Sequence, residues 1–262
     1  MNNHSTTYTI SLIGAGNVAT HLALALRNTG HRIHMIFSAT EASASQLAER
    51  VGAAWTTNLQ DLQQENVSFY IVSVRDNAMD EVISALHIMS GVIVHTTGSA
   101  GMDVLEGISS EYGVFYPFQT FRKEQAMDMS HVPLLVEGNT QETLQKIRML
   151  ALSISDYVLD FSSEQRANLH LTAAFACNFT NYMIRIAEEI LEDHKIDRSL
   201  LQPLIEETFR KFVPDNPASQ NQTGPAVRGD TVTMEKHLDL LKKHPEWQKL
   251  YILVSQLIQS NG

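Results

Sequence analysis

Short apolar runs alternate with helix-like patterns over residues 1–161 of the chain. This alternation is typical of a mostly parallel sheet whose crossover connections are helices. The expected strands are Thr9–Ile13, Ile33–Phe37, Ala53–Thr56, Phe69–Val74, Val92–His95, Gly113–Tyr116, Pro133–Val136 and Tyr157–Leu159. The expected helices are Val18–Asn28, which Gly30 ends, Glu41–Val51, Ala78–Leu86 and Gln141–Leu152. We therefore predict an α/β Rossmann domain with a doubly wound sheet over residues 1–161.

The pattern changes after about Asp160, where the strand-like runs stop. Ser162 and Gln165 have the spacing of a capping box, and an apolar-periodic segment follows as far as about Leu191. Further helices are expected at Arg198–Phe212, Thr231–Lys243 and Pro245–Ser260, with a loop over Val213–Arg228 that contains Pro214, Pro217, Gly224 and Pro225. Residues 162–262 are thus predicted to form an all-α domain.

A glycine turn links the first expected strand to the first expected helix. Gly14 is suited to the tight turn, Gly16 to the approach of a pyrophosphate, and Ala19 to close packing of helix on strand. The helix start at Asn17 and Val18 offers free N–H groups and a partial positive charge to phosphates. The pattern predicts a dinucleotide site; the alternative is a Rossmann-like domain that has kept its turn and lost its ligand.

The end of the second strand bears on the choice of dinucleotide. An acid there usually binds the ribose of NAD, and this chain has none at the expected place. Ser38 and Thr40 offer hydroxyls to a 2′-phosphate, although no arginine accompanies them and Glu41 is close. We expect NADP, with NAD as the alternative. Both hydroxyls also have a simpler interpretation as caps of the next helix.

Two further strands end in small or polar residues, where ligands of parallel sheets bind. Ser73 and Val74 close the fourth strand, and Asp76 either faces the ligand or caps the next helix. The fifth strand ends in His95 and then Thr96, Thr97 and Gly98, a turn suited to a nicotinamide or an anionic group. His95 is either catalytic or a packed, hydrogen-bonded residue. The aromatic segment Tyr116–Phe121 is expected to line the substrate pocket or to fill the space between domains.

Polar side chains within the long helical segment are candidates for catalysis. His170 and Asn178 share one helix face with Ala174 by i, i+4 spacing. Hydride transfer at a C–O centre needs an acid/base group and an amide that orients the carbonyl, and these two residues supply both. The alternative for His170 is a structural role with satisfied hydrogen bonds.

The segment Thr223–Asp230 combines glycine, proline, arginine and aspartate within eight residues. Arg228 has the geometry to bind a carboxylate or phosphate in bidentate fashion, and Asp230 is placed to cap the helix from Thr231. The alternative is a loop held together by contact between these two side chains.

Composition limits the classes of ligand and compartment. A formal charge of -10 without a lysine and arginine stripe argues against nucleic acid, and no apolar run approaches the roughly 20 residues of a membrane span. The polar start Met1–Thr7 contains no recognisable leader, and Cys177 has no partner for a disulfide, so we expect a cytoplasmic protein. Cys177 lies in an apolar run and is predicted to be buried. No histidine pair has convincing metal-ligand spacing, so no metal site is expected.

Taken together, these motifs resemble a family of NADP-dependent oxidoreductases with a Rossmann-like domain and a helical domain of unknown function. The resemblance rests on five segments: Gly14–Ala19, His95–Gly98, Tyr116–Phe121, Ala174–Asn178 and Thr223–Asp230. That family is distantly similar to pyrroline-5-carboxylate reductase, ketopantoate reductase and the 6-phosphogluconate dehydrogenase C-terminal-domain superfamily. The resemblance implies a homodimer formed through the helical domain. Many relatives carry Ser-Arg where this chain has Ser38 and Ala39, and relatives in the wider superfamily often carry a catalytic lysine where it has Ala174.

Two functions follow as hypotheses. The first is an NAD(P)-dependent reductase or dehydrogenase of a small, anionic carbonyl, hydroxy or imine compound, with His170, Asn178 and Arg228 in an interdomain cleft. The second is a dinucleotide-binding sensor or scaffold that has lost catalysis, for which the missing lysine and arginine argue. Fold-level similarity does not by itself establish chemistry.

Overall fold

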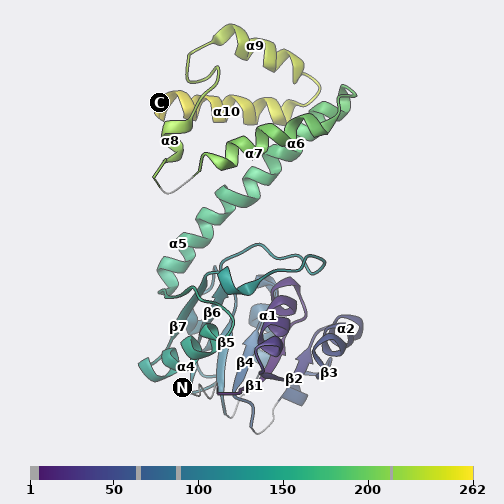
Figure 1. Ribbon diagram of the computed structural model, residues 1–262, viewed down its shortest axis with the longest axis vertical. Helices are drawn as coiled ribbons and strands as arrows, with labels where there is room; N and C mark the ends of the chain where they lie inside the picture. The colour runs from purple at the N-terminus through teal and green to yellow at the C-terminus, as the bar shows by residue number, and fades with distance from the viewer. Residues whose placement is uncertain (1–5, 63–65, 87–89, 213–214, 262) are drawn as a thin grey trace. The chain divides into compact units, whose positions relative to one another are not determined.

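The computed structural model describes residues 6–62, 66–86, 90–212 and 215–261 (Figure 1). The chain divides into two compact units, Met1–Ala174 and Phe175–Gly262, each of which is described by itself. The domain boundary predicted at residues 161 and 162 precedes this division by one helix. Of the expected features, the first five residues of the polar start, together with Val213 and Pro214 of the expected loop, lie outside the described residues.

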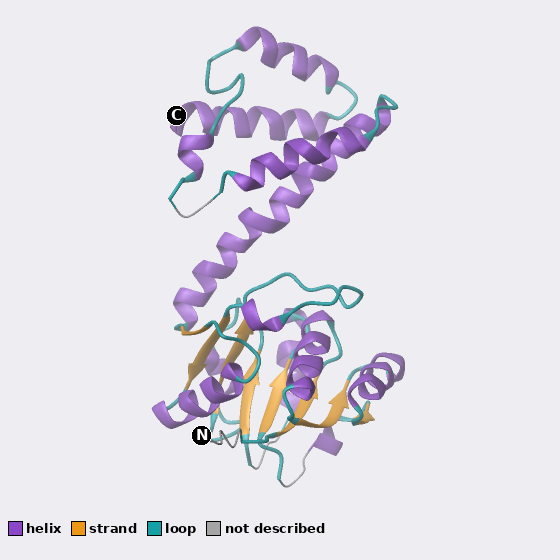
Figure 2. Cartoon of the chain, in the orientation of Figure 1, coloured by secondary structure: helices purple, strands orange, loops and turns teal. Residues whose placement is uncertain are grey.

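The first unit is built on an eight-stranded sheet in the order β3-β2-β1-β4-β5-β6-β7-β8. All neighbouring strands are parallel except β6 and β7. The strands are β1 (Thr9–Ile13), β2 (Arg32–Phe37), β3 (Ala54–Thr56), β4 (Phe69–Val72), β5 (Val92–His95), β6 (Tyr112–Pro117), β7 (Leu134–Gly138) and β8 (Val158–Asp160) (Figure 2). The predicted mostly parallel, doubly wound sheet is confirmed.

Helices cover both faces of this sheet. The helices are α1 (Asn17–Asn28), α2 (Glu41–Val51), α3 (Asp76–Ala85) and α4 (Gln141–Leu152), with 3-10 turns η1 (Leu59–Leu62), η2 (Met102–Leu105) and η3 (Met129–His131). On one face, α1, α2 and α4 pack in a core that includes Leu22, Leu47 and Ile147. On the other face, Met79 of α3 and Leu105 of η2 pack in a second core. The continuous apolar strands are those expected of a sheet that is buried on both sides.

The connection between β4 and α3 differs from its prediction. The strand ends at Val72 rather than Val74, and the helix begins at Asp76 rather than Ala78. The reason is a sharp turn: the Ser73 amide still donates to the Ile13 carbonyl at 2.8 Å, and the Ala78 amide already donates to the Arg75 carbonyl at 2.9 Å. Asp76 is therefore inside the first turn of the helix.

The predicted long helical segment after residue 162 is interrupted. The capping box is confirmed, since Ser162 accepts from the Gln165 amide and the Gln165 side chain accepts from the Ser162 amide. Helix α5 (Ser163–Ala173) then gives way to a π-helical turn, η4 (Ala174–Phe179), before α6 (Thr180–Asp193). Because π-helical bonds run from residue i to i+5, the uninterrupted i, i+4 spacing assumed between His170 and Asn178 is wrong.

The second unit is all-helical within its described residues. After α6 come η5 (Arg198–Leu201), α7 (Gln202–Arg210), α8 (Ala218–Asn221), α9 (Thr231–Leu240) and α10 (Pro245–Asn261). Helix α7 ends before Phe212, and α9 before Lys243. Cys177 is exposed, so its predicted burial is wrong: the η4 turn that carries it contains no buried residue. No helix in the described part of the chain is long and apolar enough to cross a membrane.

Two threonines at equivalent cap positions provide a test of helix capping. Thr140 at the N-cap of α4 accepts from the Thr143 amide at 3.1 Å, whereas Thr40 at the N-cap of α2 makes no such bond. We expect Thr140→Ala to lower the free energy of unfolding of the first unit by about 1 kcal/mol and Thr40→Ala to lower it by less than about half of that.

Urea titration in a Trp247→Phe background checks this prediction, because Trp55 is then the remaining tryptophan and lies in β3. Equal losses in the two variants would contradict it.

Candidate active site

A cavity of about 560 Å³ lies at the carboxyl ends of the central strands. Every residue of its lining belongs to the first unit. From the loops after β1, β4, β5 and β6 and from α5, the lining comprises Gly16, Asn17, Val18, Ser73, Val74, Arg75, Asp76, Thr96, Thr97, Gly98, Tyr116, Pro117, Gln119, Lys123 and His170. The structure thus brings His170 together with most of the residues that the sequence predicts to bind a cofactor.

Two glycines of the first turn have different roles. Gly14 has a φ of +120°, its amide donates to the Phe37 carbonyl at 2.8 Å, and a Cβ there would lie 2.2 Å from the Ser73 carbonyl oxygen. Gly14 therefore allows the ends of β1 and β4 to approach each other, and it does not line the cavity. Gly16 is exposed and has nothing within 4 Å of the position of a Cβ.

The start of α1 presents unsatisfied backbone donors to the cavity. Gly16 is its N-cap, no side chain caps it, and its first turn holds no acid. The amides of Asn17 and Val18 are among the first N–H groups of the helix, which have no partner within it. With open space over Gly16, this cradle fits a phosphate or pyrophosphate, because the helix dipole favours an anion at this end.

Ser38 and Thr40 lie at the carboxyl end of β2 and are not part of the cavity lining. Thr40 occupies the N-cap of α2, but its side chain makes no capping bond, so the capping interpretation of this hydroxyl is wrong. Ser38 is held by its backbone, whose amide donates to the Thr56 carbonyl at 3.3 Å. No hydrogen bond of the Thr40 hydroxyl occurs with any described residue.

Asp76 fixes the loop that follows β5. Its two carboxylate oxygens accept from Thr97 Oγ1 at 2.8 Å and from Ser99 Oγ at 2.7 Å. The expectation that Asp76 caps α3 is wrong, because Arg75 is the N-cap and no side chain caps the helix. Thr96 adds a bond from its hydroxyl to Ser73 Oγ at 3.1 Å, which ties the β4 and β5 ends together.

His95 is a structural residue in this arrangement. It is fully buried, its Nδ1 accepts from the Thr97 amide at 3.3 Å, and its Nε2 lies 3.1 Å from the Gly101 carbonyl, to which it donates. Burial, helped by the nearby Arg166 charge, lowers the pKa of His95 to about 4. A neutral ring with both nitrogens bound to backbone, outside the cavity lining, matches the packed interpretation of this residue.

His170 meets Tyr116 at the edge of the cavity. Nδ1 of His170 lies 2.9 Å from Tyr116 Oη, and the two rings are arranged edge to face. The His170 ring also lies directly over Gly98, where a Cβ would be 2.5 Å from Nδ1. Burial raises the pKa of Tyr116, with Asp76 acting in the same direction and Arg166 against it. From the sequence, Tyr116 was considered only as part of a segment that lines the substrate pocket or fills the space between domains, although its place at the end of β6 was a signal.

Arg166, one turn before His170 on α5, anchors that helix to the sheet. Its side chain is 1% exposed and its Nη1 donates to Glu137 Oε2 of β7 at 2.7 Å. Its Nη2 donates to the Ala100 carbonyl and to Ser163 Oγ, while Nε has no partner among the described residues. Sequence reasoning missed Arg166 because a single arginine within a polar first turn gives no signal of burial.

The remaining predicted site residues lie in the second unit. Asn178 is exposed in the η4 turn, and Arg228 is exposed in the loop before α9. Asp230 caps α9 as predicted, accepting from the Thr233 amide at 3.0 Å, and bonds from Thr233 lower its pKa. No ion pair joins Arg228 to Asp230 in the described part of the chain. The convergence of Asn178 and Arg228 with His170 stays a prediction.

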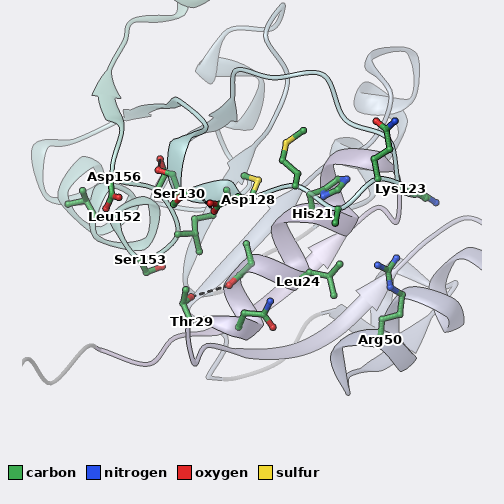
Figure 3. A pocket seen from close by; sticks show the side chains of 18 of the residues that line it. His21, Leu24, Thr29, Arg50, Lys123, Asp128, Ser130, Leu152, Ser153 and Asp156 are labelled. Carbon is green, nitrogen blue, oxygen red and sulfur yellow. Dashed lines mark hydrogen bonds between the residues drawn. The ribbon is translucent and has the colours of Figure 1, made fainter.

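A second cavity of the first unit, about 630 Å³, lies between α1, the loop around Lys123 to Ser130 and the turn after α4 (Figure 3). Its wall carries charges of both signs, including Arg50 and Asp156, and His21 Nε2 binds the Arg122 carbonyl at 2.9 Å. None of the predicted site residues lines it. Among the described residues, no group of three or more His, Cys, Asp or Glu side chains is placed to hold a metal ion.

Comparison with known proteins agrees with this organisation. Residues 2–116 match the model of a Rossmann-like domain, and residues 132–258 match a domain of unknown function, DUF2520. A Rossmann-like domain followed by a DUF2520 domain is therefore the class of protein defined here. A comparison with curated protein sequences found no match.

Solved structures resemble the chain over almost its whole length. A protein from Bacteroides fragilis, described as a "putative NADP oxidoreductase", is 41% identical over 97% of this chain and 98% of its own, with a TM-score of 0.89. Protein TM1727 from Thermotoga maritima is 20% identical over 96% and 98%, with a TM-score of 0.77. The 1-pyrroline-5-carboxylate reductase of Streptococcus pyogenes is 15% identical over 97% and 99%, with a TM-score of 0.63.

The chain belongs to the same family as the Bacteroides fragilis protein. This confirms the family resemblance. The proteins from Thermotoga maritima and Streptococcus pyogenes are similar to this chain in fold, and nothing more is inferred from them.

The buried, neutral His95 makes the stability of the first unit dependent on pH. Its pKa is about 4 in the fold against 6.5 ordinarily, so the unfolded chain binds the proton more readily. The stabilisation is complete above pH 6.5 and is lost as the pH falls towards 4, by about 3 kcal/mol in total. We expect His95→Gln, which keeps a donor for the Gly101 carbonyl, to lack this part of the acid dependence.

Urea titrations between pH 7 and 4 measure this acid dependence, with His95 and His95→Gln compared in the Trp247→Phe background. Parallel losses of stability with pH would rule the prediction out.

Proposed function

We propose that the protein is an NADP-dependent oxidoreductase that transfers a hydride between the nicotinamide and a small, anionic carbonyl, hydroxy or imine compound. One observation carries the proposal: the open N-terminus of α1 and the hydrogen-bonded pair of His170 and Tyr116 line the same cavity. An anion cradle beside a proton-carrying pair is the combination that such a reaction requires. The description of the Bacteroides fragilis relative supports the same class.

The chain offers a set of groups for the cofactor. The amides after Gly16, at Asn17 and Val18, would hold the pyrophosphate, and the loop ends at Ser73, Val74, Thr96, Thr97 and Gly98 would border the nicotinamide half. Ser38 and the uncommitted Thr40 hydroxyl would bind a 2′-phosphate. No acid stands at the usual ribose-binding place, which favours NADP over NAD. When bound, the nicotinamide supplies or accepts the hydride.

The substrate is proposed to be anionic. Arg75 and Lys123 line the cavity, and neither forms an ion pair with any described residue. Asp76, the acid in the lining, is already bound to two hydroxyls. The pair of His170 and Tyr116 would exchange the proton, while Asn178 and Arg228 would orient the carbonyl and bind the anionic group. We also propose that the protein works in the cytoplasm and meets its substrate there.

Gly16→Ala tests the cofactor site. The methyl group meets no protein atom and the backbone angles, φ -77° and ψ -169°, suit alanine, so the melting temperature should stay unchanged. The added methyl would occupy the space proposed for the pyrophosphate, so NADPH should bind at least about tenfold more weakly, as measured by calorimetry. NADH should bind the native protein more weakly than NADPH.

Gly14→Ala is the matched control for folding, because its Cβ would clash with the Ser73 carbonyl and lower the melting temperature. Unchanged NADPH affinity in Gly16→Ala would contradict the assigned site. NADPH binding by the native protein without turnover of any keto acid or imine would favour the sensor hypothesis instead.

A homodimer formed through the helical domain is part of the proposal. Helices α6, α7, α8 and α9 contain no buried residue within the described chain, although α6 and α7 are amphipathic. Leu204, Phe209 and Phe212 line an apolar groove of about 720 Å³ on this unit, and all three are exposed. Apolar helix faces need a partner, and a second copy of the same unit would cover them.

The change Leu204→Glu with Phe209→Glu should convert the protein from about twice 29.3 kDa to a single chain in light scattering after size exclusion. Charged groups on the proposed interface cost binding energy because they lose water without gaining a partner. Met149→Glu, at an exposed methionine of α4 in the first unit, should leave the dimer intact. A native mass of one chain at micromolar concentration would exclude the dimer.

A further inference from the structure

On the basis of the proposed function, we propose that Tyr116 is a catalytic residue, which exchanges a proton directly with the substrate while His170 supplies that proton from behind. The observation behind this proposal is the hydrogen bond between the buried phenol of Tyr116 and the exposed imidazole of His170. The two ends of the pair differ in their surroundings, and this difference defines the route of the proton between solvent and substrate.

Tyr116 forms the substrate end of the pair. It lies at the carboxyl end of β6, is 9% exposed, and lines the cavity beside Thr97 and Gly98. Its hydroxyl has one hydrogen-bond partner among the described residues, His170 Nδ1, so the remaining donor and acceptor capacity of Oη is available to a ligand. A phenol can donate its proton and accept a second hydrogen bond at once.

His170 forms the solvent end. Its side chain is exposed, and its Nδ1 is committed to Tyr116. Gly98 fixes the ring from below, since no atom larger than hydrogen fits between the Gly98 Cα and the imidazole. Nε2 is then the nitrogen that exchanges with water. A rigid ring with one nitrogen on the phenol and the other in solvent is suited to relay a proton.

The charged and titratable groups around Tyr116 act on its proton in opposite directions. Asp76, from α3, disfavours the phenolate, whereas Arg166, from α5, favours it. His95, behind the loop, is neutral at physiological pH because its pKa is about 4. The phenol is therefore protonated in the free protein and ready to donate in the reductive direction.

The proton and electron balance of this step is complete. As a hydride supplied by bound NADPH adds to the carbonyl carbon, the electron pair of the C–O π bond would move to oxygen, which would take the proton from Tyr116 Oη. Nδ1–H of His170 returns a proton to the phenolate, and Nε2 takes one from water. In the oxidative direction, every transfer is reversed, and the alcohol proton leaves to solvent through the same two residues.

Tyr116→Phe is the central test, because it removes Oη and keeps the ring. We expect kcat to fall by about 100-fold or more, with KM and NADPH affinity within about twofold of native values. His170→Ala should also slow turnover, and imidazole added to the buffer should restore part of it. Tyr112→Phe, at a tyrosine of β6 outside the cavity lining, controls for the loss of a phenol hydroxyl from the same strand and should leave turnover unchanged.

A measurement without turnover tests the pair itself. In the free protein, nitrogen-15 NMR of His170 should show a change at Nδ1 in Tyr116→Phe, and Gly98→Ala should produce the same change by displacing the ring. An unchanged Nδ1 signal in Tyr116→Phe, or full activity of Tyr116→Phe in a protein that turns over carbonyl substrates, overturns the relay and leaves the oxidoreductase function standing. Absence of turnover with every carbonyl and imine tested, together with the expected change at Nδ1 in Tyr116→Phe, overturns the function and the catalytic role of Tyr116 with it.

Discussion

The buried ion pair between Arg166 and Glu137 is the interaction on which the candidate site depends. It joins the first turn of α5 to strand β7, and the same guanidinium binds the Ala100 carbonyl in the loop after β5. Ser163 completes the connection, since its amide and hydroxyl donate to Glu137 and its oxygen accepts from the Met102 amide. A buried charge without its partner is strongly unfavourable, so the three segments are fixed together. His170 follows Arg166 by one helical turn and is placed by this anchor.

Three glycines around the cavity meet three different constraints. Gly14 is required because another strand end passes within contact of its Cα, and Gly98 because the imidazole of His170 lies on it. At Gly16 no protein atom approaches, so the space above it is open to a ligand. A sequence motif treats such glycines as equivalent. Their surroundings separate the two that packing requires from the one that leaves space for a ligand.

The sequence predicted the sheet well because its strands are continuous apolar runs with helical periodicity between them. Ile10, Ile71 and Val94 are all fully buried, as two-sided burial of a parallel sheet requires. The β4–α3 turn was misplaced by two residues because a turn closed by backbone bonds leaves no side-chain signature. Cys177 was expected in a core because its neighbours are apolar, but apolar periodicity does not reveal whether the chain itself covers that face.

The site could be predicted only in part for a related reason. Residues at strand ends were found, since the parallel topology alone brings Ser73, Thr97 and Gly16 to one edge. Tyr116 and Arg166 were not identified as central, because their importance arises from contacts between α5 and strands β6 and β7, which lie far from most of that helix in the sequence. A single tyrosine or arginine carries no pattern. Pairwise contacts between distant segments are the information that periodicity and motif spacing do not contain.

The charges around the cavity bear on the proposal that an acidic protein binds an anionic ligand. The chain carries a formal charge of -10, yet the acid in the cavity lining, Asp76, lies in the first turn of α3 and is bound by two hydroxyls. The helix dipole and these bonds stabilise its charge locally. No side chain caps α1, and neither Arg75 nor Lys123, both in the lining, forms an ion pair with a described residue. Such a local arrangement of positive groups can favour an anion even on a protein whose net charge is negative.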